Sequence, residues 1–225
     1  NLPAGVYVLT AVATDDQGGT NTSAPVTVTV YDPSSRWVAF NDHVAGPGTH
    51  PHATTWNAFG TDGGAPGDEG LLSNIATGGS LTANLTVMEF GAFADTVSGA
   101  PGPGTPAYDM FHDYVDFGSG DLNHAILVNR DSLVMHLFTG LDPLRRYSLR
   151  ATAVGGVANY SNRWTLFTIV GAGSFTAAHT ANVLTSATQP ALAADEAGSN
   201  TGDNRSGAMV GWGNIAPGAD GPFWL

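Results

Sequence analysis

Turn-forming residues interrupt this chain so often that few segments between them are longer than a short strand. Glycine, proline, asparagine and aspartate cluster between runs in which apolar and polar residues alternate. Such alternation places every second side chain on the same face, which is typical of a strand with one buried face. About ten short strands are expected at this spacing, which favours an antiparallel, jelly-roll-like β-sandwich over a closed barrel. The clearest runs are Arg36–Asn41, Ser80–Phe90, Asp131–Thr139, Tyr147–Val154 and Trp164–Val170.

The composition also favours an all-β fold. The 225 residues include 30 glycines and 13 prolines, and all seven basic residues are arginine. Strong helix formers of the Glu and Lys kind are therefore scarce, whereas the Thr and Val of the alternating runs suit a pleated sheet. Ala191–Ala197 is the one segment with modest helical character. Hydrophobic residues make up 42% of the chain, which is enough for a packed core.

The N-terminal part of the chain predicts a long β-hairpin. Residues 5–14 alternate, residues 15–19 are rich in Asp and Gly and form the turn, and residues 24–31 alternate again. An isolated two-stranded hairpin is at best marginally stable in water. We therefore expect this hairpin to pack on the rest of the chain, to belong to a truncated domain, or to pair with another chain.

Several residues of the hairpin carry a resemblance. Gly5-x-Tyr7-x-Leu9, then Ala13-Thr14-Asp15 and the strand Thr27-Val28-Thr29-Val30, resemble the last two strands of a bacterial immunoglobulin-like domain. Tyr7 stands where such domains place their tyrosine corner. The resemblance implies a partial immunoglobulin-like module at residues 1–33, followed by a second domain at residues 34–225.

The second domain carries a resemblance of its own. It includes Gly140-Leu141-Asp142-Pro143, then Tyr160-x-x-Arg163-Trp164-Thr165, and finally Asn214-Ile215-x-Pro217-Gly218-x-Asp220-Gly221-x-Phe223. These residues resemble uncharacterised modules of large secreted proteins of environmental bacteria. The resemblance implies a jelly-roll-like sandwich and a secreted or cell-surface location. It carries over no catalytic residue.

Charge and cysteine content exclude several classes of partner and site. The formal net charge is −12, and nucleic acids need clusters of Lys and Arg to displace counterions, so we expect no nucleic-acid binding. No apolar run reaches 18 residues, so no membrane insertion is expected. The chain has no cysteine, which excludes disulfides, thiolate metal sites and cysteine nucleophiles. Cations and neutral polymers such as glycans remain as partners.

Three histidines lie close together in the sequence. His43, His50 and His52 follow Asp42 in a region rich in Gly and Pro. Neutral imidazoles are ligands of Zn²⁺ and Cu²⁺, so these three side chains are candidate transition-metal ligands. The simpler interpretation is a polar loop whose histidines bond to backbone groups or water. No helical H-E-x-x-H motif and no G-x-S-x-G nucleophile motif accompanies them.

Two groups of carboxylates are candidate calcium ligands. The first comprises Asp113, Asp116 and Asp121, and the second comprises Asp62, Asp68 and Glu69. Ca²⁺ takes six to eight oxygen ligands, often from loops like these. Neither group matches the EF-hand pattern, so solvated turns are the alternative.

Aromatic residues favour a binding function. Sugar rings stack on flat indole faces while nearby polar side chains bond to the hydroxyls. Trp56, with Asn57 and Asp42, is the candidate ligand-binding group because it lies in the polar, Gly-rich region. The apolar surroundings of Trp37, Trp164 and Trp212 favour core positions. Arg163 is expected either to stack on Tyr160 or to pair with Asp142.

Three functions follow as expectations. The first is an extracellular adhesion or glycan-binding module, with Ca²⁺ as the cofactor to consider before a transition metal. The second is a secreted hydrolase or metal-dependent enzyme acting on polysaccharide. The third is a self-assembling surface or filament subunit that donates strands from residues 5–31.

Overall fold

The computed structural model divides the chain into two compact units, Asn1–Trp37 and Val38–Leu225. We refer to them as unit 1 and unit 2. The residues that the structure describes contain fifteen strands, one short α-helix and one 3-10 turn. The antiparallel, all-β architecture expected from the sequence is therefore confirmed. The described residues are 5–30, 36–43, 69–90, 93–95, 101–115, 126–128, 133–155, 158–218 and 221–225.

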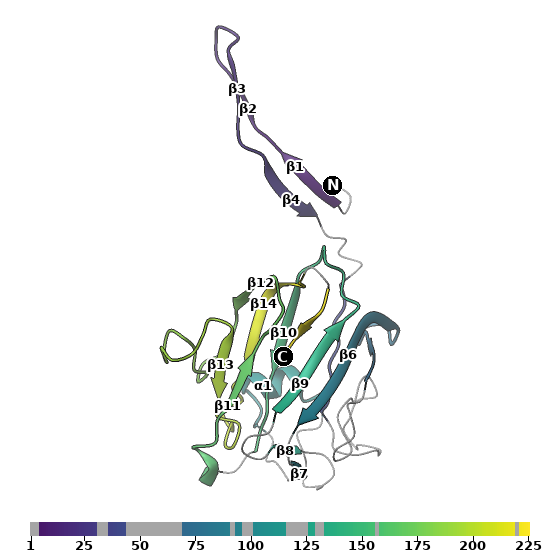
Figure 1. The fold of residues 1–225 in the computed structure, drawn as a ribbon, viewed down its shortest axis with the longest axis vertical. Coiled ribbons are helices and arrows are strands. Elements are labelled where there is room, and N and C mark those ends of the chain that lie inside the picture. Colours follow the sequence, from purple (N-terminus) through teal and green to yellow (C-terminus); the bar gives the residue numbers. More distant parts are fainter. Residues whose placement is uncertain are drawn as a thin grey trace. The chain divides into compact units, whose positions relative to one another are not determined.

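Unit 1 contains the expected long hairpin (Figure 1). Strand β1 (Gly5–Leu9) pairs with β4 (Val26–Val30), and β2 (Val12–Thr14) pairs with β3 (Thr20–Thr22), all antiparallel. We call these four strands the ribbon.

A proline explains why the ribbon ladder is interrupted. Pro25 has no N–H to donate. Nearby, the Oγ of Ser23 accepts a hydrogen bond from the backbone N–H of Ala11 at 2.9 Å. At the tip, Asp15 Oδ1 accepts from the N–H groups of Gln17 and Gly19, at 3.0 and 2.7 Å. The local side-chain bonds thus hold the turn that the Asp- and Gly-rich sequence predicts.

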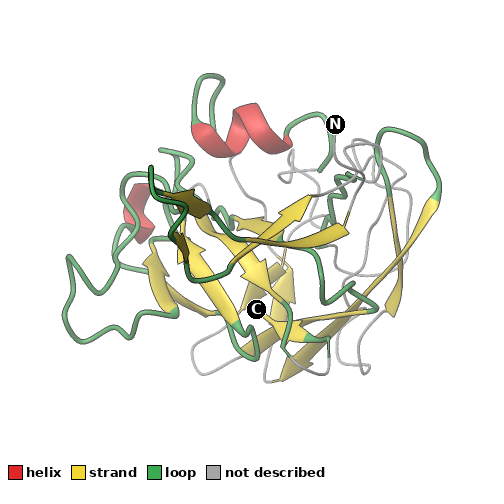
Figure 2. Ribbon diagram, turned by 90° about the horizontal axis from the view of Figure 1, so that it is seen from above, coloured by secondary structure: helices red, strands yellow, loops and turns green. Residues whose placement is uncertain are grey.

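Unit 2 is built from several antiparallel sheets (Figures 1 and 2). The largest has the strand order β15-β9-β6-β5, and a second has the order β10-β14-β12. Two smaller sheets pair β11 with β13 and β7 with β8. These sheets are consistent with the expected sandwich. The strands are β5 (Glu69–Ser73), β6 (Ser80–Phe90), β7 (Phe93–Asp95), β8 (Ile126–Val128), β9 (Leu133–Thr139), β10 (Tyr147–Ala151), β11 (Thr165–Thr168), β12 (Ser174–Ala177), β13 (Glu196–Ser199), β14 (Val210–Ala216) and β15 (Phe223–Trp224).

The core of unit 2 follows the alternation of its strands. In β6, Ala83, Leu85 and Val87 are buried on one face of the strand. In β14, Val210 and Trp212 are fully buried, which confirms the core position expected for Trp212. Burying a side chain of this size stabilises the fold by roughly 1.5–3 kcal/mol.

Two local expectations are wrong. Ala191–Ala197 forms no helix: it consists of turns that lead into β13, whose backbone pairs with β11. The helix is α1 (Pro106–Phe111), with proline in its first turn. Arg36–Asn41 forms no strand; Val38 O accepts a single backbone bond from Ile75 N–H, and Phe40 stacks on Tyr114. In both places tertiary contacts outweigh local propensity.

Candidate functional site

An exposed aromatic and aliphatic strip runs along β11. Trp164 precedes the strand and is 48% exposed, and Leu166, two residues later, is 54% exposed. Residues two apart lie on the same face of a strand. On the other face Phe167 is half-buried and Ile169 is buried. The expectation that Trp164 is a core residue is therefore wrong, because only one face of β11 is covered by the rest of the unit.

A cation stacks on an aromatic ring beside this strip. The guanidinium carbon of Arg163 lies 3.4 Å from the ring centre of Tyr160, which is a close cation–π contact. The turn between them is fixed by a bond from Arg163 N–H to Tyr160 O at 3.0 Å, and Gly202 N–H donates to Arg163 O. The stacking expected for Arg163 is confirmed.

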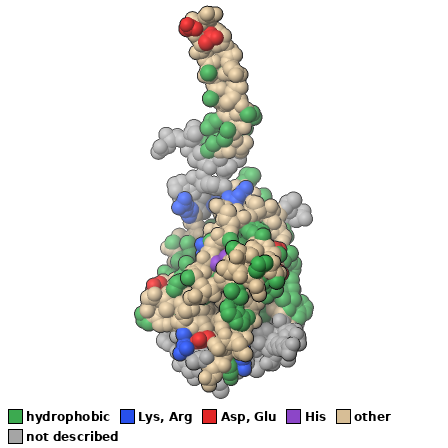
Figure 3. Space-filling view, turned by 90° about the vertical axis from the view of Figure 1, so that its left-hand side faces the viewer, with side chains coloured by type: hydrophobic (Ala, Val, Ile, Leu, Met, Phe, Trp, Pro, Cys, Tyr) green, Lys and Arg blue, Asp and Glu red, His purple; other side chains and the backbone are tan. Residues whose placement is uncertain are grey.

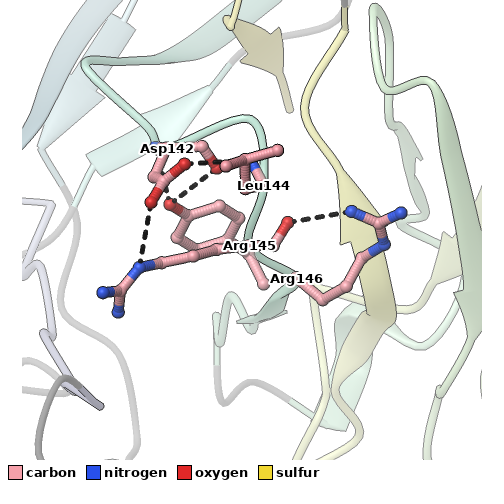
Figure 4. A network of polar contacts seen from close by, with 5 residues as sticks. Asp142, Leu144, Arg145 and Arg146 are labelled. Atoms are coloured by element: carbon pink, nitrogen blue, oxygen red, sulfur yellow. Dashed lines mark hydrogen bonds and ion pairs between the residues drawn. The ribbon is translucent and has the colours of Figure 1, made fainter. Parts of the chain in front are cut away.

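The alternative partner of Arg163, Asp142, belongs to a different network (Figure 4). Its carboxylate accepts from Leu144 N–H at 2.9 Å and from Arg145 Nε at 3.3 Å. The hydroxyl of Tyr147 accepts from Asp142 N–H and donates to Asp142 O, and burial is the main cause that raises its pKa. These bonds hold the turn between β9 and β10 together and connect it to Tyr147, the first residue of β10, so this network is structural.

Polar groups of the loop after β13 border the Tyr160–Leu166 segment. Asn200 donates from Nδ2 to Ser161 O, and its Oδ1 accepts from Asp203 N–H. The carboxylate of Asp203 pairs with Arg205 Nε at 2.5 Å, and this hydrogen bond is the main cause that lowers the pKa of Asp203. The loop after β13 is therefore bonded through Asn200 to the turn that carries Tyr160 and Arg163. A few residues further along, the same loop carries the Asp203–Arg205 ion pair.

These two sides make up the candidate site, which we call the β11 surface. It comprises Tyr160, Arg163, Trp164, Leu166, Asn200, Asp203 and Arg205. Figure 3 views unit 2 from its β11 and β13 side, where hydrophobic side chains reach the surface in separate patches among polar groups. The exposed indole, the Asn200 amide bonded to Ser161, and the Asp203–Arg205 pair on the same loop as Asn200 supply the two kinds of group that a sugar binds: an apolar face for stacking and polar groups for hydroxyl hydrogen bonds.

The sequence-predicted ligand-binding group falls mostly outside the described residues. Trp56 and Asn57 lie there, as do His50 and His52 of the predicted metal set. Asp42 is 5% exposed, and His43, next to it, is half-buried. The ring of His43 lies against the ring of His136, a residue that the sequence did not single out.

The predicted calcium groups are only partly described. Asp113 is exposed and lies 3.1 Å from His112 Nε2, whereas Asp116 and Asp121 lie outside the described residues. In the second group, Glu69 is exposed and accepts a long hydrogen bond from Thr86, while Asp62 and Asp68 are not described. Within the described ranges, no three His, Asp or Glu side chains gather as a metal-binding group. Calcium binding stays a prediction.

Trp37, which was also expected in the core, has a different position in the structure. Trp37 is half-buried rather than part of the core. For Trp164, one sequence signal indicates exposure: Tyr160-Ser161-Asn162-Arg163 is a polar turn that leads directly into the indole.

Among the helices that the structure describes, none has the length and apolar character of a membrane span.

Comparison of the chain with protein-family models, with curated proteins and with solved structures finds no match. The resemblances to an immunoglobulin-like domain and to secreted bacterial modules therefore stay predictions.

Proposed function

We propose that unit 2 is an extracellular glycan-binding module with an adhesion role, and that the β11 surface binds the glycan. The observation that carries this proposal is the half-exposed indole of Trp164 next to Leu166 and the Arg163–Tyr160 stack. A large aromatic side chain left in water at a strand edge of a packed unit is typical of a binding surface.

The charge of the chain supports a neutral glycan as the ligand. With a net charge of −12, the protein repels polyanions at long range, whereas an uncharged sugar pays no such cost. Stacking on an indole depends on the apolar face of the sugar ring, and the Asp203–Arg205 pair supplies both acceptors and donors for hydroxyl groups. The low share of charged residues, 12%, and the absence of cysteine are compatible with a secreted bacterial surface protein.

Replacing Trp164 tests this proposal. In a glycan array followed by calorimetry, Trp164→Ala should weaken binding of a neutral polysaccharide about thirtyfold, because a hot-spot residue contributes about 2 kcal/mol. Phe90→Ala is the matched control, since Phe90 is 52% exposed but lies on β6, and this variant should bind like the parent chain.

The outcomes separate the site from the function. Glycan binding that is unchanged in Trp164→Ala shows that the β11 surface is the wrong site. An array with no neutral glycan bound shows that the function is wrong. Both variants should stay folded and lose a similar stability of about 1–2 kcal/mol, because each truncates an aromatic side chain that is about half buried.

A second function, self-assembly through the ribbon, is favoured by a separate observation. In the described part of unit 1, β1 pairs with β4 alone, so each strand keeps one unpaired edge. Several large apolar side chains of the ribbon are exposed, among them Val8, Val12 and Val26. Unpaired edges that carry exposed β-branched residues are templates for pairing with another chain. Association that rises with concentration is the expected behaviour.

A further inference from the structure

Two histidines from distant parts of unit 2 meet with their ring nitrogens. His43 Nδ1 lies 3.3 Å from His136 Nε2, and 93 residues separate them in the sequence. The ring centres are 5.4 Å apart and the ring planes are 75° apart, so the rings are not stacked face to face. Both side chains are half-buried.

The fold holds His136 firmly. It lies in β9, and its N–H and C=O both bond to Leu225, at 2.8 and 3.0 Å. On the other side, the register with β6 places His136 opposite Val87, which is fully buried. Opposite residues in an antiparallel pair project from the same face, so the imidazole projects from the buried face of this sheet.

The segment that carries His43 is held by different contacts. Val38 O accepts from Ile75 N–H at 2.9 Å, and Phe40 stacks on Tyr114 with ring centres 4.2 Å apart. Phe40 also packs against the buried cluster that contains Phe111. The two imidazoles are thus positioned by independent parts of the core, which favours a pre-formed geometry.

The distance between the two nitrogens fits one shared metal ion. Two imidazole nitrogens at about 2.0–2.1 Å from a tetrahedral ion lie about 3.3 Å from each other. Without an ion the same contact is an N–H···N hydrogen bond, in which one imidazole donates and the other accepts. Asp42, which precedes His43 in the sequence, is itself buried.

We propose that His43 and His136 form a two-histidine site for a divalent first-row transition metal. Imidazole nitrogens suit Cu²⁺, Ni²⁺ and Zn²⁺, and affinities generally follow the order in which Cu²⁺ binds most tightly. The two histidines leave further coordination positions for other ligands, so the ion exchanges more readily than one held by four protein ligands. This site is independent of glycan binding at the β11 surface.

Metal titration of untagged protein tests the site. Calorimetry with Cu²⁺, Ni²⁺ and Zn²⁺ should show one ion per chain, and the Cu²⁺ complex should show two equatorial nitrogens by electron paramagnetic resonance. His43→Gln and His136→Gln should each weaken Cu²⁺ binding roughly tenfold or more, because loss of one ligand removes the benefit of chelation. His112→Gln, which changes the exposed histidine at the C-cap of α1, should bind like the parent chain.

A double variant separates this pair from the set of His43, His50 and His52. His50→Gln/His52→Gln should leave Cu²⁺ binding unchanged. Cu²⁺ binding that persists in His136→Gln but is lost in the double variant overturns the proposal. A parent chain that binds Cu²⁺ no more tightly than His136→Gln does also overturns it. Circular dichroism melts without metal identify variants that fail to fold. Cu²⁺ should raise the Tm of the parent chain, and it should leave the Tm of folded His43→Gln and His136→Gln unchanged.

Discussion

At the scale of single residues, Gly211 determines which groups lie close to the side chain of His179. The Nδ1 of His179 accepts a hydrogen bond from Gly211 N–H at 3.0 Å, and its ring is nearly perpendicular to the ring of Trp212, with ring centres 5.2 Å apart. A Cβ on Gly211 would lie 2.6 Å from Cδ of Arg150, so only glycine lets this arginine cross β14. Burial first, and then the charge of Arg150, lower the pKa of His179 below its ordinary value of 6.5.

The lowered pKa predicts a pH dependence of stability. The folded state binds fewer protons at His179 than the unfolded state, so stability rises with pH between the folded pKa and 6.5. The stabilisation is complete above 6.5 and is lost as the pH falls through 6.5 toward the folded pKa. Urea unfolding over this range should show a smaller loss for His179→Gln than for the parent chain. Parallel losses in the two proteins would contradict this assignment, and His112→Gln serves as the exposed-histidine control.

At the scale of elements, one side chain connects the loop between β13 and β14 to the end of β10. Asn204 is 4% exposed. Its Nδ2 lies 3.0–3.1 Å from Thr152 Oγ1, Ala153 O and Ala208 O, and its Oδ1 accepts from Ala208 N–H at 2.7 Å. Because the loop carries Asp203 and Arg205 of the β11 surface, this amide also supports the candidate site.

Removing the amide should destabilise unit 2. Asn204→Ala leaves buried backbone groups without partners, which costs about 2–3 kcal/mol in denaturant unfolding. Asn204 also has a positive φ of 26°, and Asn182, at 68° and exposed, is the matched control for that backbone conformation. Asn182→Ala should cost clearly less. Equal costs for the two variants would show that backbone conformation, and not the hydrogen bonds, is the cause.

At the scale of the whole molecule, the two units differ in how they bury apolar side chains. Unit 2 has a core of buried residues from β6, β14 and α1. In the ribbon of unit 1, Leu9 and Val26 face each other across β1 and β4 and are 47% and 60% exposed. Folding of a two-stranded ribbon with so little burial depends on further contacts.

The self-assembly function predicts a mass that depends on concentration. Sedimentation of the parent chain should show a rising weight-average mass, and Val8→Glu should sediment as a monomer, because a charge on the exposed edge strand β1 opposes pairing with another copy. Leu144→Glu adds charge at an exposed position of unit 2 and should behave like the parent chain. A parent chain that is monomeric at every concentration rules out assembly through the ribbon.

Local patterns predicted the elements whose own residues carry the information. The ribbon and β6 follow directly from period-two alternation and from the Asp- and Gly-rich turn at residues 15–19. Ala191–Ala197 was wrongly expected to be helical, because the helix propensity of alanine is weaker than the pairing of β13 with β11. At the candidate site, the stacking of Arg163 on Tyr160 was predictable because the two are three residues apart.

The amino-acid sequence by itself determined the all-β class, the hairpin and the acidic, cysteine-free character of the protein, because alternation, turn residues and charge are local or additive properties. Only the tertiary structure decided which side chains are covered. The run around Trp164 is apolar on both faces, and its exposure depends on which face the rest of unit 2 covers. Likewise, His43 and His136 are brought together by the anchoring of Phe40 and by the pairing of β9 with β6 and Leu225. Contacts between residues so far apart in the chain arise from packing, which no local pattern encodes.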